Sequence, residues 1–158
     1  ALQTFADLGF QVEILDISAC DRETAQAKIF QSKLLYVSGG NTFYLLQELK
    51  KKQLLSLIKE QIVDGMVYVG ESAGAIITTK DIDYNKLMDD KGVAAELHDT
   101  GALNEVDFYV LPHLGEEPFV ESAQATLDTY SDQLNLLPLN NRQAVLVEGE
   151  EVKVLEDK

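Results

Sequence analysis

A serine between glycines is the residue whose setting most clearly suggests chemistry. Residues 70–74 read GESAG, with Ser72 at the centre. An apolar run at 66–69, typical of a buried strand, precedes the motif, and residues 75–79 favour a helix after it. Such a strand–turn–helix holds a nucleophilic hydroxyl on a sharp turn, where glycines relieve crowding. The pattern predicts a nucleophile elbow at Ser72, and the alternative is a glycine-rich connection with an incidental serine.

A serine hydroxyl needs a base to act as a nucleophile at neutral pH, and the chain has two histidines. His113 follows a strand-like segment at 106–111, so we expect it at the carboxyl end of a strand, as Ser72 is. His98 lies beside Asp99 in a polar stretch, which is typical of a solvated loop. We therefore predict that His113 is the base for Ser72.

A second glycine-rich loop, at Gly39 and Gly40, follows another apolar run. Glycines leave backbone N–H groups open to an anion, so the amides of Gly39 and Ala73 are predicted to form an oxyanion hole. Gly40 and Asn41 would then contact the substrate. The alternative is that Asn41 or Thr42 caps the following helix. A Walker A loop is excluded, because no lysine follows the second glycine.

The charge balance excludes several function classes. The 158 residues include 13 basic and 27 acidic ones, a net charge of -14. Such a surface argues against nucleic acid and against anionic membranes. No apolar run approaches the ~20 residues that span a bilayer. The single cysteine, Cys20, excludes an internal disulfide and indicates a reducing compartment, so we expect a cytoplasmic protein. One cysteine and two histidines do not suggest a metal site.

Strand-like and helical segments alternate along the chain, which predicts an α/β fold: a three-layer sandwich with a mostly parallel sheet and a C-terminal β-hairpin. Residues 80–104 are polar and are expected to form a surface excursion. We expect residues 1–158 to form one domain that lacks its first strand, because the chain opens on a helix. Predicted helices are 1–8, 22–30, 42–52, 54–64, 75–79 and 117–134, and predicted strands are 10–15, 34–37, 66–69, 106–111, 143–148 and 151–155.

Taken together, these segments resemble peptidase family S51, which includes aspartyl dipeptidases and cyanophycinases. The resemblance rests on residues 37–43, 70–75 and 112–113, and it extends over about 34–148. It implies a flavodoxin-like fold of the class I glutamine amidotransferase type. It also implies that Ser72 is the nucleophile, that His113 is the base, and that neither a metal nor an organic cofactor takes part. The implied substrate is a small peptide, and a homodimer is left open.

Two departures from the family pattern bear on the site. Leu139 stands where the family carries a glutamate proposed as the third triad member. We predict that Asn140 orients the imidazole instead, with Glu116 and Glu117 as alternatives. In addition, residues 117–134 contain no Lys or Arg, so this segment would repel an acidic substrate side chain or attract a cationic amine.

The sequence therefore predicts a serine peptidase that hydrolyses small peptides through an acyl-enzyme on Ser72. The main alternative is an inactive binding domain of the same fold, which the leucine at Leu139 favours. A glutamine amidotransferase is a weaker alternative, because a serine replaces the usual cysteine.

Overall fold

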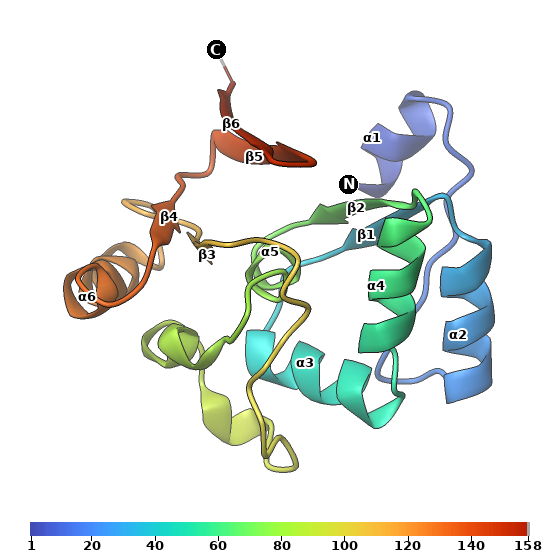
Figure 1. The fold of residues 1–158 in the computed structure, drawn as a ribbon, viewed down its shortest axis with the longest axis horizontal. Coiled ribbons are helices and arrows are strands. Elements are labelled where there is room, and N and C mark those ends of the chain that lie inside the picture. Colours follow the sequence, from blue (N-terminus) through green and yellow to red (C-terminus); the bar gives the residue numbers. More distant parts are fainter. Residues whose placement is uncertain (158) are drawn as a thin grey trace.

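The computed structural model describes residues 1–157, and Figure 1 shows its helices and strands. Two short 3₁₀ helices, η1 and η2, lie in the connection between α5 and β3. In chain order, the elements are α1 (Leu2–Asp7), α2 (Arg22–Gln31), β1 (Leu34–Val37), α3 (Thr42–Lys51), α4 (Leu55–Val63), β2 (Val67–Gly70), α5 (Ala73–Ile76), η1 (Asp83–Leu87), η2 (Lys91–Val93), β3 (Tyr109–Leu111), α6 (Val120–Tyr130), β4 (Leu136–Pro138), β5 (Gln143–Glu148) and β6 (Glu151–Glu156).

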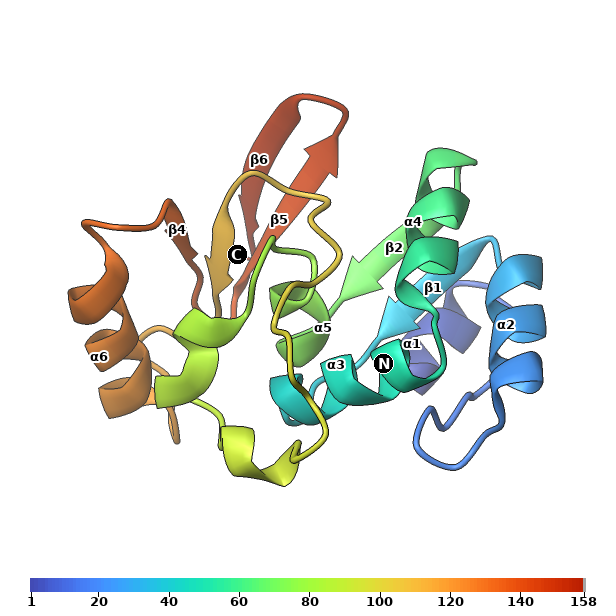
Figure 2. The same cartoon turned by 60° about the horizontal axis from the view of Figure 1, so that its bottom comes forward.

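The strands form two parallel pairs and one antiparallel hairpin. β1 pairs with β2, with Leu34 opposite Val67 and Val37 opposite Gly70. β3 pairs in parallel with β4, and β5 pairs with β6 around the turn at residues 149–150. Each pair is a separate two-stranded sheet, and α5 contacts β1, β2 and β3 between them (Figure 2). The predicted α/β class and the C-terminal hairpin are confirmed.

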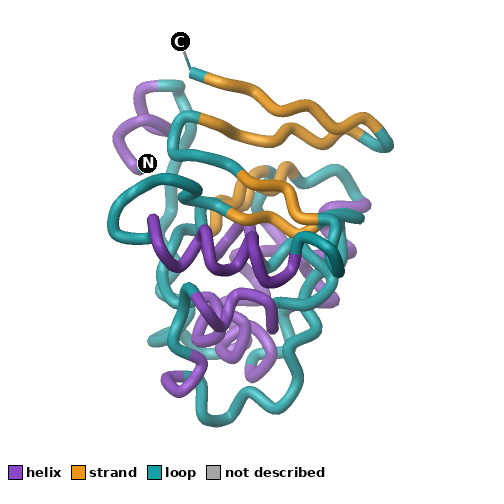
Figure 3. The backbone as a smooth tube through the Cα atoms, turned by 90° about the vertical axis from the view of Figure 1, so that its left-hand side faces the viewer, coloured by secondary structure: helices purple, strands orange, loops and turns teal. Residues whose placement is uncertain are grey.

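Helix α3 is the centre of the main core. Its apolar residues recur at helical spacing, and Phe43 and Leu46 are fully buried. Leu54 and Ile58, at the start of α4, and Ile77, just after α5, complete this buried centre. Figure 3 shows the strands gathered in the upper half of the molecule, with the hairpin outermost and most of the helices beneath them.

Local capping residues begin and end several helices. The Asp21 side chain accepts a hydrogen bond from the Thr24 N–H at 2.7 Å at the start of α2. Asn41 does the same for the Tyr44 N–H at 3.0 Å at the start of α3. α4 ends before Gly65, whose φ of 100° is a left-handed conformation that favours glycine.

The predicted strand at 10–15 is wrong, because this segment forms no strand within the described residues. Its apolar residues alternate, but Phe10, Val12 and Ile14 are exposed. An alternating pattern becomes a strand only when a neighbouring strand accepts its backbone hydrogen bonds, and no such neighbour lies beside it in residues 1–157. That the chain forms one domain with a further strand upstream stays a prediction.

The excursion at 80–104 is more than a surface loop. It contains η1 and η2, and it sends apolar side chains into the main core. These side chains are irregularly spaced in a mostly polar segment, so the sequence shows no helical or strand period there. The buried apolar residues of the excursion are Ile82, Tyr84, Ala94, Leu97 and Leu103.

The remaining differences are shifted element ends and one strand that was not predicted. α5 spans Ala73–Ile76 rather than 75–79, and α6 begins at Val120 rather than at residue 117. β4, at Leu136–Pro138, was absent from the predicted strands. Three residues with a terminal proline are too few to show a strand period.

Candidate active site

Ser72 stands on a strained turn between β2 and α5. Its φ of 51° and ψ of −110° are rare for a residue with a side chain, a conformation that costs about 1–3 kcal/mol. Both flanking glycines are sterically required. A Cβ on Gly70 would lie 2.4 Å from the Gly74 carbonyl oxygen, and a Cβ on Gly74 would lie 2.1 Å from that of Val37. The motif therefore has the tight geometry of a nucleophile elbow.

Neighbouring groups hold the elbow in place. The Glu71 N–H donates to the Val37 carbonyl oxygen at 2.9 Å, which continues the pairing of β2 with β1. The Tyr68 hydroxyl donates to the Gly74 carbonyl oxygen at 2.6 Å. Burial raises the pKa of Tyr68, so this phenol remains neutral and keeps its proton for that bond.

His113 reaches Ser72 from the end of a neighbouring strand. β3 ends at Leu111, and His113 follows with a φ of 63°. Its Nε2 lies 2.9 Å from the Ser72 Oγ, and both residues are half-buried. A hydroxyl held at this distance from an imidazole can transfer its proton to the ring as it attacks. The other histidine, His98, is exposed in the excursion.

Asn141, rather than Asn140, holds the second imidazole nitrogen. The Asn141 Oδ1 lies 2.6 Å from the His113 Nδ1. Since this oxygen accepts, the imidazole carries its proton on Nδ1 and leaves Nε2 free to accept from Ser72. The Asn140 side chain turns elsewhere and accepts from the Arg142 N–H at 2.9 Å. Consecutive side chains of the turn after β4 point in different directions, and sequence spacing alone did not distinguish them.

Two further residues support the imidazole. The ring of Phe119 stacks on that of His113, with centroids 4.8 Å apart and planes 19° apart. The Glu116 carboxylate accepts from the Asn141 N–H at 3.4 Å, and the Glu116 N–H donates to the His113 carbonyl oxygen at 3.0 Å. Glu116 thus contacts the backbone of both residues rather than the imidazole. Phe119 was not among the predicted site residues, and its only signal in the sequence is its closeness to His113 along the chain.

The two predicted oxyanion-hole amides lie beside the serine. A Cβ on Gly39 would stand 3.2 Å from the Ser72 Cβ, closer than ordinary contact, so glycine allows this approach without crowding. Ala73 directly follows Ser72 at the start of α5 and is fully buried. Within residues 1–157, neither N–H donates to another protein group. Ala73 is buried and Gly39 is exposed. A buried amide without a partner is uncommon, and both N–H groups are placed to donate to an anion.

The other two residues of the glycine loop have different surroundings. The Asn41 side chain caps α3 through its oxygen, and its Nδ2 donates to the Asp90 carbonyl oxygen at 2.9 Å. Asn41 therefore caps the following helix, which is the alternative that the sequence left open. Gly40, with a φ of 144°, is exposed and has open space where a side chain would be. Of this pair, Gly40 is the one open to a substrate.

Among residues 1–157, no group of three His, Cys, Asp or Glu side chains is placed to bind a metal ion. No helix in this part of the chain is long and apolar enough to cross a bilayer.

Comparison with known proteins places this geometry in a family. The model of "Peptidase family S51" matches residues 1–155. The chain belongs to peptidase family S51. An uncharacterized peptidase of Pasteurella multocida is 47% identical over 150 residues, which cover 95% of this chain and 72% of the relative. A probable alpha-aspartyl dipeptidase of Drosophila melanogaster is 33% identical, and the match covers 95% of this chain and 62% of that protein.

A solved structure gives the same fold. The crystal structure of a putative peptidase E protein from Listeria monocytogenes superposes with a TM-score of 0.94 at 39% identity, covering 99% of this chain and 76% of that one. The predicted S51 membership is confirmed, and so is the predicted enzyme class. The chain is a serine-type peptidase.

Proposed function

We propose that this S51 chain hydrolyses small peptides through an acyl-enzyme on Ser72. The observation that carries the proposal is the 2.9 Å contact between the Ser72 Oγ and the His113 Nε2, with Asn141 behind the ring. A rigid elbow, a base and an orienting group in this order form a working nucleophilic site. The inactive-domain alternative loses support, because it expected the serine to lie far from the histidine.

In the first half of the reaction, His113 takes the hydroxyl proton of Ser72 as the Oγ bonds to the scissile carbonyl carbon. The carbonyl oxygen becomes an oxyanion, which the N–H groups of Gly39 and Ala73 are placed to receive. The intermediate collapses when the C–N bond breaks and the imidazolium gives its proton to the leaving amine. The products are an amine and an ester on Ser72.

In the second half, a water molecule replaces the amine. His113 takes a proton from the water, the resulting hydroxide adds to the ester carbonyl, and the same two amides receive the oxyanion. Ser72 then leaves and recovers its proton from the imidazolium. Asn141 keeps the ring in the required tautomer through both halves, and Phe119 restrains the ring plane.

Charges around the site favour substrates without an acidic side chain at the scissile residue. Glu71, next to the nucleophile, is exposed, and its carboxylate accepts a hydrogen bond from the Tyr36 hydroxyl rather than from a cation. α6, which follows His113, contains no Lys or Arg. The Drosophila relative is named an alpha-aspartyl dipeptidase, and we propose that this chain prefers neutral or cationic residues instead.

The proposed location and partners rest on composition and charge. A cytoplasmic location rests on the single cysteine, Cys20, which is a free thiol. The absence of nucleic-acid binding rests on the charge of -14. A homodimer stays open.

The decisive experiment replaces the nucleophile. Ser72→Ala should abolish peptide hydrolysis and covalent labelling by a fluorophosphonate, because within residues 1–157 the Ser72 hydroxyl is the one that the imidazole contacts. The matched control is Ser131→Ala, at an exposed serine after α6, which should label like the parent chain. Undiminished labelling of the Ser72→Ala variant, with circular dichroism unchanged, would rule out the proposed nucleophile.

A further inference from the structure

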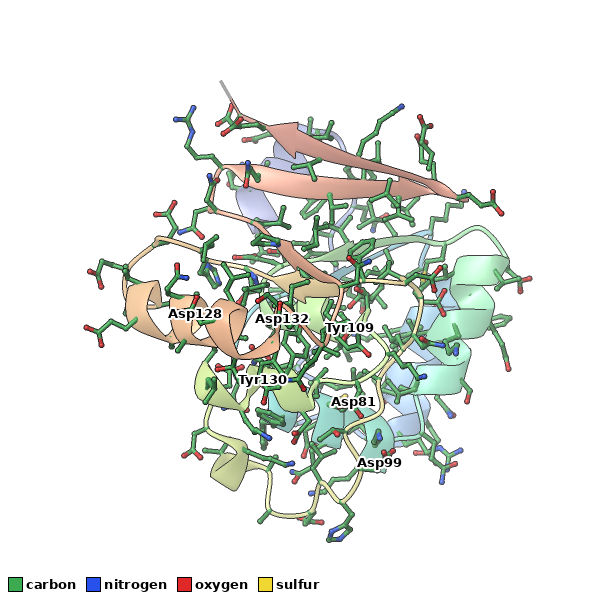
Figure 4. All side chains as sticks on the ribbon, turned by 60° about the vertical axis from the view of Figure 1, so that its left-hand side comes forward. Asp81, Asp99, Tyr109, Asp128, Tyr130 and Asp132 are labelled. Carbon is green, nitrogen blue, oxygen red and sulfur yellow. The ribbon has the colours of Figure 1, made fainter. Side chains whose placement is uncertain are left out.

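Three tyrosines line a hollow at the far end of β3 from the catalytic residues. The hollow has a volume of about 240 Å³. Tyr109 opens β3, whereas His113 lies beyond the opposite end of that strand. Figure 4 shows Tyr109, Tyr130 and Asp81 on one face of the molecule. The lining residues are Asp81, Asp83, Tyr84, Tyr109, Tyr130, Gln133 and Leu134.

The aromatic lining is held in place before any ligand arrives. Tyr84 is 3% exposed, and its hydroxyl donates to the Val110 carbonyl oxygen. The rings of Tyr84 and Tyr109 meet edge to face, with centroids 5.4 Å apart and planes 84° apart. Burial also raises the pKa of Tyr84, so this ring carries no charge at neutral pH. A preformed wall loses little entropy when a ligand binds.

The two carboxylates of the hollow differ in how their charge is balanced. Asp83 is paired with Lys86 at 2.7 Å and with Lys91 at 2.8 Å. Asp81 accepts only neutral hydrogen bonds, from the Asp83 N–H at 2.8 Å and from the Thr100 hydroxyl at 3.0 Å. No ion pair to Asp81 forms within residues 1–157, so its negative charge remains available to a ligand.

We propose that this hollow binds a small organic cation, of the quaternary or alkylated ammonium class. Tyrosine rings attract such ions through their electron-rich faces, and a carboxylate adds charge attraction. The volume lies below the roughly 300–1,000 Å³ of sites for drug-sized ligands, which fits a compact group. Asp132, just after α6 on the face shown in Figure 4, favours the approach of cations.

The test compares a cation with its neutral isostere on the whole chain. Choline is titrated into the ¹⁵N-labelled protein and followed by NMR, and 3,3-dimethylbutan-1-ol, which replaces the nitrogen by carbon, is titrated in parallel. We expect saturable choline shifts around Tyr84, Tyr109 and Tyr130, and an affinity for the alcohol at least about tenfold lower. Equal affinities, or choline shifts centred elsewhere, would overturn the proposal.

Variants then assign the binding to the hollow. Asp81→Asn keeps an oxygen that accepts from Asp83 and Thr100, and it should weaken choline binding by about fivefold or more. Asp128→Asn makes the same charge change on α6 outside the lining, and it should leave the affinity within about twofold. An equal loss in both variants would contradict a specific site.

Two more variants complete the assignment. Tyr130→Leu should weaken choline binding, while the amide signals of residues outside the hollow stay unchanged. This variant tests the hollow independently if Asp81→Asn alters the structure of the excursion. Ser72→Ala should bind choline as the parent does, because the hollow and the proposed nucleophile are separate sites. Loss of choline binding in Ser72→Ala would contradict that separation.

Discussion

At the scale of single residues, Asn141 contacts the second imidazole nitrogen of His113, the proposed base. Its Oδ1 holds the Nδ1 of His113 at 2.6 Å and so selects the tautomer that can accept the Ser72 proton. An amide does this without a charge, whereas a carboxylate would also stabilise the protonated ring. The site is therefore arranged to orient its base more than to increase its basicity.

Changes at Asn141 should separate these two effects. Asn141→Ala should lower kcat on the order of 10²-fold, because the ring loses its orientation. Asn141→Asp should retain activity at high pH but move the acid limb of the kcat/KM profile to higher pH, since a carboxylate favours the inactive, protonated imidazole. Rate measurements from pH 5 to 9 check both outcomes.

The neighbouring asparagine provides the comparison. Asn140 accepts a backbone hydrogen bond from Arg142 and does not contact the imidazole. Asn140→Ala should therefore keep the pH profile of the parent chain. If Asn140→Ala costs as much as Asn141→Ala, the orienting role of Asn141 is refuted.

At the scale of elements, the site depends on how closely α5 approaches β1. Gly74 leaves no room for a side chain against the Val37 carbonyl oxygen. The register that sets Val37 opposite Gly70 also brings Gly39, beyond the end of β1, against Ser72. The nucleophile and the loop of its proposed oxyanion hole are thus aligned by one pair of parallel strands.

Gly74→Ala should therefore weaken the fold and the site together. Its Cβ would meet backbone rather than a movable side chain, so we expect a loss of about 2 kcal/mol or more in the free energy of unfolding. Urea denaturation measures the loss, and fluorophosphonate labelling should slow with it. Gly101→Ala is the control, because its new Cβ would come no closer than 3.4 Å to an Asp99 carboxylate oxygen. Equal midpoints for the two variants would exclude close packing as the cause.

At the scale of the whole molecule, excess negative charge opposes folding. The net charge is -14, and the pairs formed by Lys86 and Lys91 with Asp83 offset only a little of it. Repulsion over the surface acts at long range, and salt screens it. Exposed ion pairs contribute little by comparison.

Salt should accordingly stabilise the chain. Raising sodium chloride from ~0.01 M to ~0.1 M shortens the Debye length from about 30 Å to about 10 Å, and Tm should rise by a few degrees. Glu150→Lys, in the exposed hairpin turn, should raise Tm at the low salt concentration and have less effect at the high one. A Tm that falls with salt would mean that the ion pairs outweigh the repulsion.

Local chemistry made part of this site predictable. The elbow at Ser72 lies within a few consecutive residues, and its glycines, strand and helix are all short-range features. The place of His113 followed from one rule, that functional groups gather at the carboxyl ends of parallel strands. The caps at Asp21 and Asn41 are also local, because a cap bonds to a backbone amide three residues away.

The rest depended on contacts between distant segments. The choice of Asn141 over Asn140 follows from the direction of a turn that must meet a loop 28 residues earlier. Residues 10–15 have the alternating pattern of a strand, but no neighbouring strand pairs with them within residues 1–157. The excursion at 80–104 buries apolar side chains whose spacing shows no helical or strand period. The sequence by itself determined the α/β class and pointed to Ser72 and His113 as the proposed nucleophile and base, because these rest on local patterns. Only the tertiary structure decided which amide holds the imidazole and where the tyrosines meet, because those outcomes depend on how separate elements pack.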